Sequence, residues 1–247
     1  MNKTVKIILS ISLLFLVYGC SFNSPFKTLY YETEKSSSHK NMIIFLRGRG
    51  GDHRDFESQG FVDEVLKRKL PFAMAAPNAH FGYYFSETLV SRLKIDIIEP
   101  AKLKGYEKFW LVGVSMGGLG SLMYARQHLE DIEGICLISP FLGYEKIISE
   151  IYNAGGLKYW EPGDYNPDGD WQRMFWHWLK QCISGEKTLP DIYLCYGTED
   201  SFAKAHKLLE NIIPAGKTIS TPGGHTVDVM KKLWILFLDK NYLKQYE

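Results

Sequence analysis

The sequence has little cysteine. It contains only Cys20, Cys136, Cys182 and Cys195, and no two of them form a C-x-x-C pair. Structural zinc modules usually contain such pairs, so the sequence gives no indication of bound metal. Cys136 and Cys195 lie in apolar, strand-like runs, as small buried hydrophobic residues do. The three cysteines beyond the N-terminus leave at least one unpaired, which excludes a disulfide framework.

The sequence also lacks an excess of charge of one sign. Lys and Arg total 29, Asp and Glu total 28, and the formal net charge is +1 at pH 7. A nucleic-acid-binding domain usually has a basic patch or stripe, and neither half of this chain is strongly basic. The 247 residues contain no internal repeat and no low-complexity tract. This composition argues against a nucleic-acid partner and is sufficient for one packed core.

No apolar run is long enough to span a membrane comfortably. The run over residues 7–18 has about a dozen residues, whereas a span needs roughly 20. It follows two lysines, which is the layout of a secretory signal. Residues 17–20 (VYGC) resemble the lipobox of bacterial lipoproteins, in which Cys20 becomes the acylated N-terminus. We therefore predict a signal peptide over 1–19 and an exported lipoprotein of the cell envelope, held to the membrane through Cys20. An ordinary signal peptide and an uncleaved anchor are the alternatives.

Strand and helix patterns alternate after Asn41. Residues 20–40 are expected to form a tether, with a first strand within FKTLYYET. Apolar runs predict strands over 42–46, 72–77, 109–114, 132–139 and 192–197, and KTIST predicts a short strand over 217–221. Helical patterns are found over 56–69, 86–103 with an interruption at Pro100, 116–129, 202–212 and 227–243. Such alternation builds a mostly parallel sheet with helices on both faces, so the predicted fold class is α/β.

One loop at a strand end contains a catalytic motif. Residues 113–117 read GVSMG and match G-x-S-x-G between the strand 109–114 and the helix 116–129. A sharp turn there forces Ser115 into a strained backbone conformation and exposes its hydroxyl at the helix N-terminus. Gly113 and Gly117 are expected because side chains would clash with the neighbouring strand and helix. Ser115 is therefore the predicted nucleophile, and a phosphate-binding loop is excluded because no G-K-[ST] follows.

A serine nucleophile needs a base, and the base needs an acid to orient it. The strand 192–197 leads into Glu199 and Asp200, of which we favour Asp200 as the acid. The strand 217–221 leads into Gly-Gly-His225, and His225 completes the chain order Ser, Asp, His. The other histidines are assigned to loops near the site (His53, His80), to polar or helical surfaces (His39, His128, His206) and to packing (His177).

Together these stretches resemble the α/β-hydrolase fold from about Asn41 to Leu243. The resemblance rests on FLRGRGGDH, GVSMGGLGSLMYA, CYGTEDSFAKAHKLLENI and TPGGHTVDVMKKLWILFL. It is greatest to the compact esterases of the esterase D and feruloyl or acetyl esterase type. It implies hydrolysis of small-molecule carboxylic esters or thioesters through an acyl-enzyme, without a cofactor or a metal. The hydrolase domain would cover 41–247, with a cap inserted at about 141–190.

The resemblance also implies an oxyanion hole of two backbone N–H groups. One donor is Met116, directly after the nucleophile. The loop after the strand 42–46 supplies the other, and where the family usually has His-Gly-x this chain has Arg47-Gly48-Arg49. The matching donor is the N–H of Arg49, with Gly48 second. The arginine side chains either pair with Asp52 or Asp55, the favoured interpretation, or bind an anionic substrate.

The predicted cap is rich in aromatic residues. These rings either line a site for an acyl or aryl group or form the small core of the cap. Residues 164–169 (DYNPDG) match the first half of a calcium loop, but its twelfth position is Phe175 rather than Glu. We therefore predict a polar turn there.

The leading hypothesis is a serine esterase. A serine peptidase or an acyltransferase on the same triad is the enzymatic alternative, because the pocket decides what attacks the acyl-enzyme. A non-catalytic binding protein with a hydrolase fold is the third hypothesis, and the presence of Ser115, Asp200 and His225 argues against it.

Overall fold

The structure is a computed structural model, which describes residues 24–33 and 40–243. The predicted signal peptide, the predicted lipidation site Cys20 and the surface assignment of His39 lie outside the described residues. None of the helices in the described part has the length and apolar character needed to cross a membrane.

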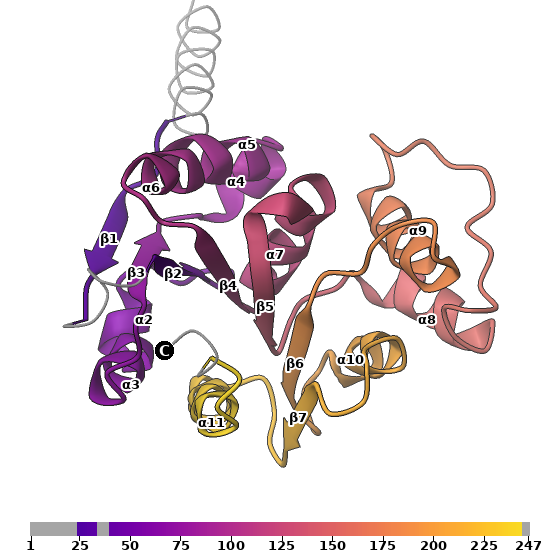
Figure 1. Ribbon diagram of the computed structural model, residues 1–247. Helices are drawn as coiled ribbons and strands as arrows, with labels where there is room; N and C mark the ends of the chain where they lie inside the picture. The colour runs from indigo at the N-terminus through magenta and orange to yellow at the C-terminus, as the bar shows by residue number, and fades with distance from the viewer. Residues whose placement is uncertain (1–23, 34–39, 244–247) are drawn as a thin grey trace, which may run out of the picture.

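A seven-stranded sheet forms the centre of the molecule (Figure 1). Its strands lie in the order β1-β3-β2-β4-β5-β6-β7. Their bounds are Thr28–Tyr31 (β1), Asn41–Leu46 (β2), Ala73–Pro77 (β3), Lys108–Val114 (β4), Ile132–Ile138 (β5), Ile192–Gly197 (β6) and Thr218–Thr221 (β7). β2 to β7 are parallel, and β1 is antiparallel to β3. The prediction of a mostly parallel α/β fold is confirmed, and β1 is the first strand expected within FKTLYYET.

Helices cover both faces of this sheet (Figure 1). Every residue of β2, β3 and β6 is buried, as expected for parallel strands covered on both sides. α2 (Asp55–Ser58), α3 (Phe61–Lys67) and α11 (Val227–Asp239) pack on one face. The other face is covered by α4 (Phe81–Phe85), α5 (Leu89–Leu93), η1 (Lys94–Ile98), α6 (Glu99–Leu103), α7 (Met116–Gln127), α8 (Glu145–Asn153), α9 (Trp171–Ser184) and α10 (Ala203–Glu210). η2 (Leu129–Asp131) is a short 3-10 turn before β5.

Two predicted helices are divided in the structure. The helix expected over 56–69 is α2 followed by α3, because Gly60 between them has a left-handed backbone with φ of 75°. The helix expected over 86–103 is α5, the π-helix η1 and α6. Pro100 cannot donate a hydrogen bond, and its ring clashes with the carbonyl four residues earlier in a regular helix. The wider π-turn over 94–98 accommodates this, so the interruption begins before Pro100. α4 was not predicted.

The insertion at about 141–190 contains α8 and α9 (Figure 1). Five of its rings are buried in the same core as residues of β5 and β6: Phe141, Trp160, Phe175, Trp176 and Trp178. Trp176 Nε1 donates a hydrogen bond to Leu142 O at 2.9 Å. The calcium-like segment is a polar turn, in which Asn166 Oδ1 accepts from the N–H of Asp168 at 3.1 Å. These buried rings therefore stabilise the fold.

Candidate active site

Ser115 occupies the sharp turn between β4 and α7. Its φ of 51° and ψ of −115° lie outside the regions that residues with side chains usually adopt. β5 and the residues after it hold this turn from both sides. The N–H of Ser115 donates to Ile138 O at 3.0 Å, and its carbonyl accepts from the N–H of Phe141 at 2.9 Å. The strained backbone predicted for the nucleophile position is therefore present.

The two glycines of the motif allow a close approach of backbone segments. A Cβ on Gly117 would lie 1.9 Å from Leu46 O of β2. A Cβ on Gly113 would lie 2.4 Å from Gly117 O. Neither distance is possible for real atoms, so no other residue fits without moving α7. The predicted clashes with a strand and with the helix are confirmed.

Ser115, His225 and Asp200 form one hydrogen-bonded chain. His225 Nε2 lies 3.0 Å from Ser115 Oγ, and His225 Nδ1 lies 2.8 Å from Asp200 Oδ2. Asp200 is 5% exposed, whereas the competing Glu199 is exposed. The three residues follow β4, β6 and β7 at their carboxyl ends, as predicted.

The environment of Asp200 keeps its carboxylate ionised. Burial by itself raises the pKa of Asp200, but hydrogen bonds from His225 and from the N–H of Phe202 outweigh it and lower the pKa. The Phe202 N–H donates to Asp200 Oδ1 at 2.8 Å. An ionised Asp200 favours the proton on Nδ1 of His225, which leaves Nε2 free to accept the proton of Ser115.

Aromatic rings support the imidazole from the side of the cap. Phe202 packs against His225 in an edge-to-face arrangement, with ring centroids 5.0 Å apart. Phe141 contacts Phe202 at 5.4 Å and Trp171 of the cap at 6.3 Å. Phe141, at the start of the insertion 141–190, therefore reaches His225 through one intervening ring, that of Phe202.

The loop after β2 lies against the nucleophile. A Cβ on Gly48 would lie 3.3 Å from Ser115 Cβ. In residues 24–33 and 40–243, the N–H groups of Gly48 and Arg49 donate to no acceptor. Met116 is the first residue of α7, so its N–H has no acceptor within the helix. These are the N–H groups that the sequence predicted for the oxyanion hole, and they remain available to a reacting oxygen.

A cavity of about 340 Å³ opens beside Ser115. It lies between the loop after β2, α2 and the start of α11. Its lining residues are Arg47, Gly48, Arg49, Gly50, Gly51, Asp55, Phe56, Gln59, Val114, Ser115, His225, Val227 and Met230. None of these belongs to the insertion 141–190, so the aromatic residues of the cap do not line this cavity.

The favoured ion pairs of this loop are not formed. Among the described residues, no carboxylate lies within 4.0 Å of a guanidinium nitrogen of Arg47 or Arg49. Asp52 instead pairs with Arg54, with Nε and Oδ1 2.9 Å apart. Asp55 Oδ2 accepts from the N–H of Asp52 at 2.7 Å. The carboxylates brace the loop through other partners, so the interpretation that the arginines pair with them is wrong.

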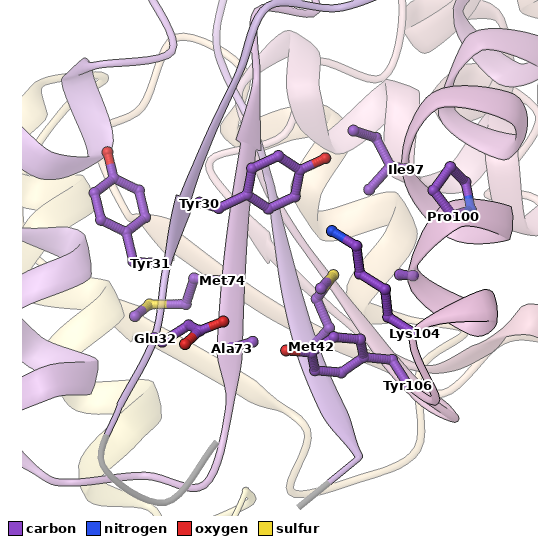
Figure 2. Close-up of a pocket in the computed structure, with 11 residues that line it drawn as sticks. Tyr30, Tyr31, Glu32, Met42, Ala73, Met74, Ile97, Pro100, Lys104 and Tyr106 are labelled. Atoms are coloured by element: carbon purple, nitrogen blue, oxygen red, sulfur yellow. The ribbon is translucent and has the colours of Figure 1, made fainter. Parts of the chain in front are cut away.

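A second cavity of about 90 Å³ lies near the amino ends of the parallel strands, and Figure 2 shows residues that line it. It is lined by residues at the beginning of β2 and β3, including Met42 and Ala73, and by Lys104 and Tyr106 before β4. The Lys104 ammonium lies 5.7 Å from the centre of the Tyr30 ring. Because Ser115 follows the far end of β4, this cavity is separate from the candidate active site.

His206 is a neighbour of the site that the sequence assigned to a surface. Its side chain is fully buried, and its Nε2 lies 2.8 Å from Pro140 O. Burial lowers the pKa of His206 to about 4, so the neutral ring donates from Nε2. Phe202, His206 and Leu209 lie at helical spacing, and this apolar stripe was the signal for burial.

One group of potential metal ligands is found within the described ranges, formed by His128, Glu130 and Asp131. Asp131 is buried, and its two oxygens already bind Lys94 at 2.6 Å and Lys102 at 2.5 Å. Its carboxylate therefore connects η1 and α6 to the start of β5, and the arrangement is explained by ion pairs.

A protein-family model described as "Putative esterase" matches residues 23–221. The match contains Ser115 and Asp200, and His225 lies four residues beyond it. No curated protein matches the sequence.

Several solved structures have a similar fold. S-formylglutathione hydrolase FrmB of Staphylococcus aureus has a TM-score of 0.55 and 13% identity, over 87% of this chain and 95% of its own. Est1E of Butyrivibrio proteoclasticus, solved with ferulic acid bound, has a TM-score of 0.59 and 14% identity, over 87% and 94%. A monoacylglycerol lipase of Paleococcus ferrophilus has a TM-score of 0.56 and 14% identity, over 91% and 100%. At these identities the likeness concerns the fold.

Proposed function

Because this chain belongs to the esterase family and has the α/β-hydrolase fold, it is a carboxylic ester hydrolase, and we propose that Ser115, His225 and Asp200 are its catalytic residues. The observation that supports these roles is the continuous chain of hydrogen bonds, 3.0 Å from serine to histidine and 2.8 Å from histidine to aspartate. Its members have the types and the order that acyl transfer requires.

In the proposed reaction, Ser115 Oγ forms a bond to the acyl carbon while His225 Nε2 accepts the hydroxyl proton. Asp200 stabilises the resulting imidazolium. The N–H groups of Met116 and Arg49, with Gly48 second, stabilise the negative oxygen of the tetrahedral intermediate. When the bond to the leaving alcohol breaks, His225 gives its proton to the alcohol oxygen. Water then attacks the acyl carbon while His225 accepts its proton. The bond between the acyl carbon and Ser115 Oγ breaks, His225 returns the proton to Ser115 Oγ, and the carboxylic acid is released.

This proposal is tested with a fluorophosphonate probe and with p-nitrophenyl acetate. The wild type should label, and Ser115→Ala should not. Ser115→Ala should lower kcat by about 10⁶-fold and Asp200→Asn by about 10⁴-fold. Glu199→Gln is the matched control, because this adjacent carboxylate is exposed and should leave activity unchanged. Folded wild type that does not label would overturn the proposal, and cleavage of aminoacyl-arylamides would indicate the peptidase alternative.

We further propose that the chain is exported and anchored in the cell envelope by a lipid on Cys20. The lipobox-like VYGC after a short apolar run supports this. Ser24, four residues beyond Cys20, contacts the domain through its carbonyl, which accepts from Tyr83 OH at 3.0 Å. An acyl chain on Cys20 would therefore hold the domain close to the membrane surface. Separation of membrane and soluble fractions tests this proposal.

A further inference from the structure

The cavity beside Ser115 contains two arginines without a carboxylate partner. Arg47 is 8% exposed; its NH1 donates to Asn78 Oδ1 at 3.2 Å, and its buried Nε has no hydrogen-bond partner. Arg49 is exposed, and its guanidinium lies 5.2 Å from the centre of the Phe81 ring. Ion pairs with carboxylates are formed instead by arginines elsewhere in the described chain, namely Arg54, Arg68, Arg92 and Arg173.

The groups around Arg47 are mostly neutral. Asn78 is an amide. Burial, and then the positive charge of Arg47, lower the pKa of His80, which favours its neutral ring. Burial raises the pKa of Tyr84, so its hydroxyl stays protonated. The negative charges of Asp52 and Asp55 act on Arg47 from beyond contact distance. A buried cation without a contacting anion is unfavourable, and a bound anion would offset this.

The loop places the backbone between these two arginines next to the nucleophile. Gly48 separates the two arginines in the chain and contacts Ser115, with a Cβ position 3.3 Å from Ser115 Cβ. A guanidinium binds a carboxylate or a phosphate through two parallel hydrogen bonds. An anionic group held by this loop would therefore lie within a few atoms of the ester carbonyl. The cavity of about 340 Å³ has room for a small acyl or alcohol group there.

We propose that the enzyme prefers small esters that carry an anionic group, a carboxylate or a phosphate, and that Arg47 and Arg49 bind this group. The inference rests on the proposed esterase function and adds the class of substrate. Asp55 also lines the cavity, but its carboxylate is bound to the N–H of Asp52. The two arginines outnumber this one carboxylate among the lining residues, so positive charge is in excess there.

The test compares matched pairs of esters. p-Nitrophenyl hydrogen succinate is compared with p-nitrophenyl pentanoate, and 4-acetoxybenzoate with 4-acetoxybenzamide. 4-Acetoxyphenyl phosphate distinguishes a phosphate from a carboxylate. The wild type should have a kcat/KM at least about tenfold higher for an anionic ester than for its neutral partner. Added salt should reduce this ratio.

The variants assign the preference to residues. Arg47→Gln and Arg49→Gln should each lower the ratio, Arg47→Gln by about tenfold and mainly through the KM of the anionic ester. Arg47→Lys should retain part of the preference for anionic esters. Lysine keeps the positive charge but cannot form the two parallel hydrogen bonds of a guanidinium. Arg54→Gln is the matched control, since Arg54 lies in the same loop but pairs with Asp52. It should leave the ratio unchanged.

The outcomes separate this inference from the proposed function. Hydrolysis of the neutral esters with equal rates for the anionic ones, or ratios unchanged in both glutamine variants, would overturn the anion preference and leave the esterase assignment standing. Wild type that neither labels with fluorophosphonate nor hydrolyses the neutral esters would overturn both. If Arg47→Gln does not fold, the test relies on Arg49→Gln, because Arg49 is exposed. An unchanged ratio of kcat/KM between anionic and neutral esters in that variant would count against the inference.

Discussion

The acid of the triad has a buried, neutral histidine among its neighbours. His206 lies close enough to Asp200 to act on its pKa, and its Nε2 donates a hydrogen bond to Pro140 O. The next residue, Phe141, donates its N–H to the carbonyl of Ser115. The His206 ring therefore connects α10 to the backbone of the nucleophile. Protonation of His206 would place a positive charge in a buried site, and burial is the main cause of its low pKa. Its low pKa is a property of the folded protein alone, so it links stability to pH.

We expect His206→Gln to flatten the dependence of stability on pH. In the unfolded chain a histidine has a pKa of about 6.5, whereas folding lowers that of His206 to about 4. The unfolded state then binds more protons between these values, so the wild type loses stability as the pH falls through this window. Between pH 7 and pH 4.5 the loss from this residue is about 2 kcal/mol.

Urea unfolding at pH 7 and pH 4.5 measures this difference. Glutamine retains a donor for Pro140 O but does not titrate. The partly exposed His128→Gln is the matched control and should keep the pH dependence of the wild type. Equal losses of stability in His206→Gln and in the wild type would contradict the expected role of His206.

Three strands and one helix fix the position of the nucleophile. β4 ends at Val114, α7 begins at Met116, and the carbonyl end of β2 lies against Gly117. Ile138 O, at the end of β5, accepts a hydrogen bond from the N–H of Ser115. The next residue, Ser139, donates its N–H to Cys195 O of β6 at 2.7 Å. The strand of the nucleophile and the strand of the acid are thus joined through β5.

Gly117→Ala should disrupt this arrangement. Its Cβ would lie 1.9 Å from Leu46 O, so α7 must shift away from β2. We expect a loss of unfolding free energy of about 3 kcal/mol or failure to fold, at the upper end of overpacking effects. Gly169→Ala is the control, because its Cβ would meet no atom closer than 3.8 Å. Urea unfolding measures both, and similar stabilities for the two variants would argue against the close approach.

At the scale of the whole molecule, the beginning of the described chain lies at the same edge of the sheet as the active site. β1 pairs antiparallel with β3, and Thr28 lies opposite Pro77 at the carboxyl end of β3. Phe26 packs on Tyr83 with ring centroids 4.6 Å apart, and its N–H donates to Asp96 Oδ2 at 2.9 Å. A lipid attached a few residues earlier would hold the catalytic edge towards the membrane.

Cys20→Ser should therefore move the protein from the membrane fraction to the soluble fraction. Its kcat/KM for a soluble p-nitrophenyl ester should stay unchanged, because the fold and the triad do not depend on the anchor. Cys182→Ser is the control and should remain in the membrane fraction, since a thiol in α9 has no part in anchoring. A Cys20→Ser protein that stays with the membrane would favour an uncleaved apolar segment as the anchor.

Much of the candidate site was predictable from local patterns. The apolar runs predicted β2 to β6 nearly to the residue, because parallel strands buried on both faces need continuous apolar sequence. The edge strand β7 is polar and only half-buried, and it was predicted from the short KTIST segment. The roles of Ser115, Asp200 and His225 were inferred from short motifs at the ends of those runs. The division of the helix 56–69 was missed, and the predicted interruption at Pro100 begins earlier, because the conformation of Gly60 and the π-turn before Pro100 depend on packing as well as on local preference.

The sequence by itself determined the strand order along the chain, the strained turn at Ser115 and the candidate acid and base, because each follows from residue types and spacing within a short segment. Only the tertiary structure decided which charges near the nucleophile are paired. Asp52 forms its arginine ion pair with Arg54, and neither Arg47 nor Arg49 has a carboxylate partner. Pairing of this kind depends on distances between side chains on different segments, which spacing along the chain does not fix. The spacing of Phe202, His206 and Leu209 indicates a buried helix face, but only the packing of α10 against the sheet placed His206 beside the triad.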